Sequence, residues 1–231
     1  MLKEKNVLIT GSTRGIGWAM ATKLAEEGAK VIVTGRGDKA PTKLAPNMTY
    51  RKIDFSNYDE IASLRDSLKS EGISLDILIN NAGNTIVKDY KEMTIEDFDT
   101  VNNLNYRSVF ATTRLFMDDL VANKGGIVNI LSIAVTDIFT GNSLYAASKS
   151  AVSTMMKVLR EELRDDEVDV VNVYPGATST DLWPDDLRKE HEHKMMTPDD
   201  VAAAIMPAIE AITDGKMTVE EIVLRPKKGN I

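Results

Sequence analysis

The chain has 231 residues, of which 43% are hydrophobic and 27% charged, a composition typical of folded globular proteins rather than disordered chains. The absence of cysteine excludes disulfides, thiolate metal sites, iron–sulfur clusters and cysteine nucleophiles. The net charge of −7 argues against broad binding to a phosphate backbone, so nucleic acid is not an expected partner.

Neither a targeting signal nor a metal site is expected from this sequence. The chain runs from Met1 into an apolar strand without a signal-peptide core, and no apolar run approaches the roughly 18 residues of a membrane span. We therefore expect a cytoplasmic protein without membrane contact, and the lack of cysteine fits a reducing cytosol. His191 and His193 are too few for a metal site, so we expect no metal.

Short apolar runs alternate with longer segments of helical period along the chain. The first run, residues 6–10, is followed by a glycine turn and by a helical pattern over residues 16–27. Runs that are apolar at nearly every position, such as residues 77–79, suit parallel strands covered on both faces. Further strands are predicted at residues 30–34, 49–54, 75–80, 126–132, 168–174 and 221–224.

This alternation favours an α/β fold, a single doubly wound Rossmann-type domain over residues 1–231. We expect a parallel sheet of about seven strands with helices on both faces. One domain is the better expectation, although length alone does not exclude two small ones. Helix starts are indicated by Thr94 with Asp97 three residues later, and by a threonine, proline and two acids at residues 197–200.

A glycine-rich turn joins the first predicted strand to the helix that follows. Its sequence, TGSTRGIG over residues 10–17, has glycines that let the backbone turn tightly and approach a pyrophosphate at the positive end of the helix. The alternative is a plain structural turn between strand and helix. The residues that we expect to bind a dinucleotide here are Gly11, Ser12, Thr13, Arg14, Gly15, Ile16 and Gly17.

Tyr145 and Lys149 lie four residues apart in a segment, 143–164, that is predicted to be helical, so their side chains share one face. The pair alone is a weak signal, but it follows a strand whose carboxyl end carries Ser132, and ligands in doubly wound sheets bind beyond such ends. A phenol near pKa 10 needs a nearby ammonium to bring its pKa toward the working range. Lys149 supplies that charge, which predicts proton transfer through Tyr145.

The TGxxxGIG turn, the YxxxK pair and a serine thirteen residues before the tyrosine together resemble the short-chain dehydrogenase/reductase family. The resemblance covers about residues 5–224. It implies an oxidoreductase that transfers a hydride between a nicotinamide cofactor and a carbonyl or secondary alcohol. It also implies that Tyr145 donates the proton, that Lys149 bonds the nicotinamide ribose, and that Ser132 holds the substrate carbonyl oxygen.

The family's fourth active-site residue, an asparagine on the helix after the fourth strand, maps onto Asn105. Two more asparagines at residues 102–103 leave the register open. The apolar spacing over residues 98–104 places Asn105 just after a buried position, which favours it, and an amide on the helix surface is the alternative. Ser108 stands where the family usually has glycine, so we expect the packing there to differ a little.

The charges at the end of the second predicted strand indicate the cofactor. NADP carries a 2′-phosphate where NAD has a hydroxyl that usually meets a carboxylate. The acid that NAD-selective members tend to carry is replaced by Gly35, whereas Arg14 and Arg36 are placed to grip a phosphate dianion. NADP(H) is therefore the expected cofactor, and Asp38 keeps NAD(H) open. The alternative is that both arginines are ordinary solvated surface residues.

Two further strand ends match the family in the same order along the chain. NNAG at residues 80–83 resembles its turn beside the adenine ribose, and PGATST at residues 175–180 resembles its PGxxxT segment, in which Thr180 would bind the nicotinamide carboxamide. Each is also common turn chemistry. The resemblance thus implies cofactor contacts, beside the glycine turn and Arg36, from Asp54, Phe55, Asn81, Ala82, Gly83, Tyr145, Lys149, Pro175, Gly176, Thr178 and Thr180.

The chain departs from the family pattern at two places. Residues 219–226 replace the glycine-rich tail of many members, which puts assembly through that edge in doubt, and Leu131 stands where many members have a first serine. Helices around residues 96–121 and 143–163 are expected to make homodimer or homotetramer contacts, as the family's do, unless they serve only to cover the sheet.

Two other functions compete with the oxidoreductase. A dinucleotide-binding sensor or scaffold would keep the fold without turnover. A sugar-nucleotide epimerase or dehydratase shares YxxxK but has a longer carboxyl-terminal substrate domain, for which this chain has no room. The substrate, a small-molecule carbonyl or alcohol, is expected to be selected by residues 84–93, 133–144 and 178–196, the last forming a lid.

Overall fold

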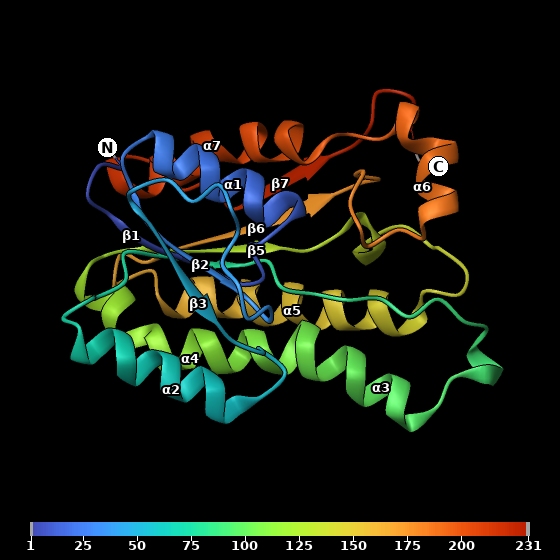
Figure 1. Cartoon of the computed structure of the whole chain (residues 1–231), viewed down its shortest axis with the longest axis horizontal. Helices are drawn as coiled ribbons and strands as arrows, with labels where there is room; N and C mark the ends of the chain where they lie inside the picture. The colour runs from blue at the N-terminus through green and yellow to red at the C-terminus, as the bar shows by residue number, and fades with distance from the viewer. Residues whose placement is uncertain (1, 230–231) are drawn as a thin grey trace.

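The computed structural model describes residues 2–229, so Met1, Asn230 and Ile231 of the predicted domain lie outside the described residues. The chain forms a sheet of seven parallel strands in the order β3-β2-β1-β4-β5-β6-β7 (Figure 1). This arrangement confirms the predicted doubly wound α/β fold. The strands are β1 (Asn6–Ile9), β2 (Lys30–Gly35), β3 (Met48–Lys52), β4 (Ile77–Asn80), β5 (Gly126–Ile130), β6 (Asp169–Pro175) and β7 (Glu221–Leu224).

The central strands follow from apolar runs that are buried on both faces. Every residue of β4 and β5 is buried. The strand order reverses between β1 and β4, and the glycine turn and the NNAG turn follow these two strands. A crevice outside the carboxyl ends of strands at such a reversal is where doubly wound sheets bind ligands. The strand predicted at residues 126–132 ends at Ile130, because the chain leaves the sheet there and enters a short 3₁₀ turn, Ile133–Val135.

Helices cover both faces of the sheet (Figure 1). The apolar sides of α1 and α7 pack against one face of the sheet and form one core. Those of α2, α4 and α5 pack against the other face and form a second core. Among residues 2–229, no helix is both long and apolar enough to cross a bilayer. The helices are α1 (Gly15–Glu26), α2 (Tyr58–Ser70), α3 (Ile95–Asn102), α4 (Ser108–Ala122), α5 (Ser143–Glu162), α6 (Asp185–His191) and α7 (Pro198–Asp214), with short 3₁₀ turns at Tyr90–Glu92 and Glu192–Lys194.

The two predicted helix starts are confirmed as capping boxes. Thr94 accepts a hydrogen bond from the backbone of Asp97 at the start of α3, and Thr197 caps α7 in the same way, with Pro198 as the first helical residue. Each acid returns a bond to the backbone of its threonine, so two amide groups at each helix start gain partners.

The predicted lid, residues 178–196, leaves the sheet and returns to its starting point. Thr178 and Met196 form a parallel bridge, and the amide of Met196 also donates to the carbonyl of Ala177 at 3.0 Å. α6 lies within this excursion. The two ends of the segment are therefore joined beside the carboxyl end of β6.

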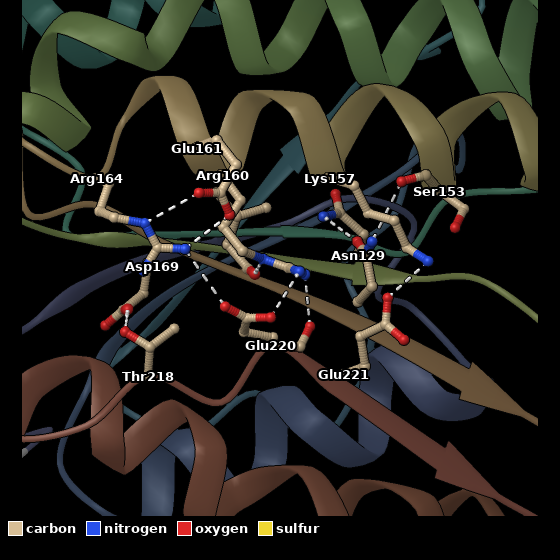
Figure 2. Close-up of polar contacts among 12 residues, drawn as sticks. Asn129, Ser153, Lys157, Arg160, Glu161, Arg164, Asp169, Thr218, Glu220 and Glu221 are labelled. Carbon is tan, nitrogen blue, oxygen red and sulfur yellow. Dashed lines mark hydrogen bonds and ion pairs between the residues drawn. The ribbon is translucent and has the colours of Figure 1, made fainter.

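Helix α5 is tied to the sheet by polar contacts (Figure 2) as well as by apolar packing. The buried side chain of Arg160 donates from Nε to the carbonyl of Val170 at 2.8 Å and from Nη2 to the carbonyl of Glu220 at 2.6 Å. One turn earlier, Lys157 forms an ion pair with Glu221 at 2.8 Å. Since these bonds reach β6 and the start of β7, they fix where α5 lies along the strands.

Candidate active site

The glycine turn between β1 and α1 approaches the NNAG turn so closely that side chains are excluded. Gly11 and Gly15 have φ angles of 62° and 58°, in the left-handed region that favours glycine. A Cβ on Gly17 would lie 2.5 Å from Nδ2 of Asn81. That amide group donates to the carbonyls of Thr10 and Gly11 at 3.0 and 2.9 Å. Asn81 therefore fixes the glycine turn through two of its carbonyls, and the glycines expose backbone rather than side chains at the surface of the turn.

The side chains of this turn have different roles. Ser12 is fully buried, and its hydroxyl donates to the carbonyl of Ile9 and accepts the amide of Thr34, both at 2.9 Å. The amide of Ser12 also donates to the carbonyl of Thr34 at 2.8 Å, so both the hydroxyl and the amide of this predicted cofactor contact are already bonded within the protein. Arg14 is exposed and lies 3.4 Å from a carboxylate oxygen of Asp181 in the predicted lid. The lid and the phosphate turn thus lie next to each other.

A cleft of about 500 Å³ opens beside the ends of β2 and β3. Its lining includes Arg36, Asp54 and Asn84, and the Oδ1 atom of Asn84 is buried with no hydrogen-bond partner among residues 2–229. Although burial raises the pKa of Asp54, hydrogen bonds from Ser56 lower it, and the net shift is downward. Phe55 is 4% exposed and packs in the core, so its side chain does not reach this cleft.

The predicted cofactor contacts fit a dinucleotide. The glycine turn offers backbone amides at the start of a helix, the cleft offers an arginine and a carboxylate, and the orphaned oxygen of Asn84 offers an acceptor. At the other end, a Cβ on Gly15 would lie 3.5 Å from Cγ2 of Thr180, so the PGxxxT segment faces the turn. In that segment the hydroxyl of Thr178 is buried and donates to the carbonyl of Gly176, while Pro175 ends β6.

Asn105 and Lys149 meet at Gly83 of the NNAG turn. A Cβ on Gly83 would lie 3.3 Å from Oδ1 of Asn105 and 3.4 Å from Nζ of Lys149. Lys149 is 6% exposed, and its Nζ donates to the carbonyl of Ile130 at 2.9 Å. The end of β4, the end of β5 and one face of α5 therefore come together at these side chains.

A wide π-type turn places Asn105 in the interior. The predicted continuous helix over residues 96–121 is interrupted at Asn103–Arg107, between α3 and α4. Asn105 lies in this turn and is fully buried. Its amide group bonds both backbone groups of Asn84 at 2.9 Å and donates to Oγ of Ser148 at 3.1 Å. Asn105 is therefore a fixed interior amide and not a helix-surface residue.

Ser132 and Tyr145 complete the predicted group. Oγ of Ser132 accepts the amide of Ala134 at 3.1 Å, which leaves the hydroxyl proton of the serine to be donated elsewhere. Burial raises the pKa of Tyr145, and a hydrogen bond with Ser132 partly opposes this shift. Burial also lowers the pKa of Lys149 to about 8.

The pKa of Tyr145 differs from the expectation that Lys149 would lower it. Nζ of Lys149 lies 5.8 Å from the centre of the tyrosine ring and is bonded to the carbonyl of Ile130. In this arrangement desolvation of the phenol is the largest effect on its pKa, so Tyr145 is a protonated phenol at neutral pH.

Two residues that position the site are absent from the sequence-based set. Asn84 and Ser148 hold Asn105. Asn84 directly follows the NNAG turn and Ser148 precedes Lys149, so proximity to the motifs was the one available signal. The contacts themselves join residues 21 and 43 positions apart, which no local pattern reveals.

The fold and these strand-end turns define a dinucleotide-binding protein of the doubly wound class. A family model described as short chain dehydrogenase matches residues 5–191, and the chain therefore belongs to the short-chain dehydrogenase family of oxidoreductases, which use NAD(P) cofactors. An uncharacterized oxidoreductase of Staphylococcus aureus strain MW2 is similar over 232 residues at 28% identity, covering 98% of this chain and 99% of the relative.

Solved structures share the fold. The ligand-free aldohexose dehydrogenase of Thermoplasma acidophilum aligns at a TM-score of 0.84 and 24% identity, over 96% of this chain and 92% of its own. A short-chain dehydrogenase of Streptomyces avermitilis aligns at 0.86 and 24% identity, over 96% and 89%. A structure described as an NADH-dependent reductase responsible for alginate metabolism aligns at 0.85 and 25% identity, over 98% of both chains.

Replacing Lys149 is expected to change how stability depends on pH. The folded-state pKa of about 8 lies below the ordinary 10.5, so the unfolded chain binds more protons between these values. The free energy of unfolding of the wild-type chain therefore gains on the order of 3 kcal/mol from this group as the pH rises through that window. In Lys149→Met this gain is absent, which urea unfolding from pH 7 to pH 10.5 measures.

The control is Lys43→Met, which removes an exposed lysine and the same single charge. If the wild-type chain and Lys149→Met show the same pH dependence of the free energy of unfolding, burial does not lower the pKa of Lys149.

Proposed function

We propose that this chain is an NADP(H)-dependent carbonyl reductase or alcohol dehydrogenase in which Tyr145 is the general acid and base. The observation that carries the proposal is the meeting of Ser132, Tyr145 and the buried Lys149 at the carboxyl ends of the strands, next to a glycine turn that fits a dinucleotide. The cytoplasm is the proposed site of action, because a cysteine-free chain fits a reducing compartment.

Each side chain has a proposed role in this reaction. A bound nicotinamide dinucleotide would supply or accept the hydride. Tyr145, a protonated phenol at neutral pH, would donate its proton to a substrate carbonyl oxygen. Ser132 would donate its hydroxyl proton to the same oxygen, since its Oγ already accepts the amide of Ala134. Lys149 would stabilise the phenolate that forms, and Asn105 holds Asn84, the residue that follows the NNAG turn.

The preference for NADP(H) is supported by the end of β2. A Cβ on Gly35 would lie 2.5 Å from Cγ2 of Thr13, so the acid of NAD-selective members would have to displace that side chain. Arg36 lines the cleft beside Asp54, where it can meet a 2′-phosphate. The observation that favours NAD(H) instead is the similar structure described as an NADH-dependent reductase.

The first test is oxidation of NADPH with a panel of ketones, aldehydes and 3-oxoacyl thioesters. We expect turnover with at least one class, and Tyr145→Phe should lower kcat by about 100- to 10,000-fold, because the general acid is lost. NADPH binding, followed by fluorescence titration, should change little. Tyr90→Phe, at a tyrosine that is 80% exposed, is the matched control. Binding of NADPH without turnover in any class, unaffected by Tyr145→Phe, would favour the sensor or scaffold.

The second test concerns the 2′-phosphate. Arg36→Ala should raise the KM for NADPH by about 10- to 100-fold, since a charge-assisted bond to phosphate is lost, and leave the KM for NADH nearly unchanged. Arg114→Ala, which removes an exposed arginine from α4, is the control. Equal effects of Arg36→Ala on both cofactors would contradict the assignment of this residue to the 2′-phosphate.

We also propose that the chain forms a homodimer or homotetramer through α4 and α5. The support is that both helices expose large apolar side chains, with Phe110 57% and Val158 55% exposed. Light scattering after gel filtration should give a mass two or four times that of one chain, and Phe110→Glu should reduce it to a single chain. A wild-type protein that elutes as one chain at micromolar concentration would contradict this assembly.

A further inference from the structure

The segment that begins at Ser132 is one tight turn. The amide of Ala134 donates to Oγ of Ser132 at 3.1 Å, and the amide of Val135 donates to its carbonyl at 3.2 Å. The amides of Thr136 and Asp137 both donate to the carbonyl of Ile133, at 2.9 and 2.8 Å. Because each bond spans two to four residues, a shift of Asp137 at the end of the turn would be transmitted to Ser132 at its start.

The far end of this turn is gripped by a residue from the segment after β7. Arg225 donates from Nη1 to Oδ2 of Asp137 at 2.6 Å and from Nη2 to Oδ1 at 2.9 Å. Thr136 donates its hydroxyl to the same Oδ1 at 3.0 Å. A guanidinium that bonds both oxygens of a carboxylate fixes its orientation as well as its distance, which a lysine ammonium cannot do.

Arg225 is itself held by neighbours that pack against the opposite wall of the site. The amide of Gly176 donates to the carbonyl of Leu224 at 2.7 Å. A Cβ on Gly176 would lie 3.0 Å from Cδ of Pro226 and 3.4 Å from Cδ1 of Ile133. Pro226 is buried. Residues 224–226, the turn after β6 and the turn that begins at Ser132 therefore pack as one unit.

We propose that Arg225 is a positioning residue for Ser132, acting through Asp137. The proposal rests on the proposed function, because it assigns Arg225 to the placement of the serine hydroxyl that would meet the substrate carbonyl. It gives a role to residues 219–226, which stand where many family members have a glycine-rich tail. The competing interpretation is a partly exposed surface ion pair of little consequence, since side-chain exposure is 41% for Arg225 and 23% for Asp137.

Steady-state kinetics of the full chain with NADPH and a carbonyl substrate from the panel test the proposal. Arg225→Met should lower kcat by about 10- to 100-fold, as expected for a displaced catalytic hydroxyl. The KM for NADPH should stay within about 2-fold, because the glycine turn and its supports are untouched. Arg225→Lys keeps the positive charge but cannot bond both carboxylate oxygens of Asp137, so its kcat should also stay below that of the wild-type chain.

Two further variants separate positioning from general damage. The exchanged pair, Arg225→Asp with Asp137→Arg, should recover most of the kcat lost in Arg225→Met, because the bidentate bond is rebuilt in the opposite sense. Lys124→Met breaks an exposed ion pair with Glu167 elsewhere on the surface and should keep wild-type kcat. The proposal is overturned by a wild-type kcat in Arg225→Met, or by a loss in Lys124→Met of the same size.

Hydrogen exchange gives a readout that does not depend on turnover. The amides of Val135, Thr136 and Asp137 should exchange faster in Arg225→Met than in the wild-type chain, with unchanged exchange in β4 and in α5. Unchanged exchange of these three amides would overturn the proposal. If the wild-type chain turns over no carbonyl, the proposed function fails, and exchange alone decides whether Arg225 holds the turn at Ser132.

Discussion

The candidate site depends above all on the placement of helix α5 against β5 and β6. One face of this helix carries Tyr145 and Lys149, and the ammonium of Lys149 is bonded to the carbonyl of Ile130 at the end of β5. At the other end of the helix, Arg160 bonds two backbone carbonyls (Figure 2). Apolar packing alone is non-directional, whereas bonds to carbonyls at both ends fix the position of the helix along the strands. The tyrosine hydroxyl is thereby placed by the sheet.

A row of buried amides extends this constraint across the sheet at some cost in stability. Asn80, Asn129 and Asn172 are register neighbours on β4, β5 and β6, and each donates to the next at 2.9 and 3.0 Å. Asn172 then donates to the carbonyl of Ser153 on α5 at 3.4 Å. Oδ1 of Asn80 is buried without a partner among residues 2–229, which costs about 1–3 kcal/mol. The unpaired oxygen of Asn80 and the buried ammonium of Lys149 both lower the stability of the fold. Such costs are typical of a site whose side chains are held in fixed positions for function.

The sequence predicts those parts of the site that local chemistry determines. Apolar runs give the strands, capping boxes give two helix starts, and Tyr145 and Lys149 share a face because helical spacing requires it. The π-type turn has no such signal. The apolar spacing over residues 98–104 indicated a buried stripe, yet Phe98 is 49% exposed and Asn105 is buried. Long-range bonds to Asn84 and Ser148 account for this difference, and tertiary contacts of this kind lie outside any local pattern.

The strand end that leads into Ser132 and the helix that carries Tyr145 are each anchored to the sheet. In the loop between them, Ile138 is 93% exposed. The amide of Leu131 donates to the carbonyl of Val173 on β6 at 2.8 Å, so the end of β5 is held by its neighbouring strand, and Ile130 is held by Lys149. The sheet and α5 therefore anchor the backbone at both residues, and the turn that begins at Ser132 bonds the oxygen of the serine hydroxyl. Loops carried on a rigid scaffold can vary in sequence while the scaffold keeps its geometry.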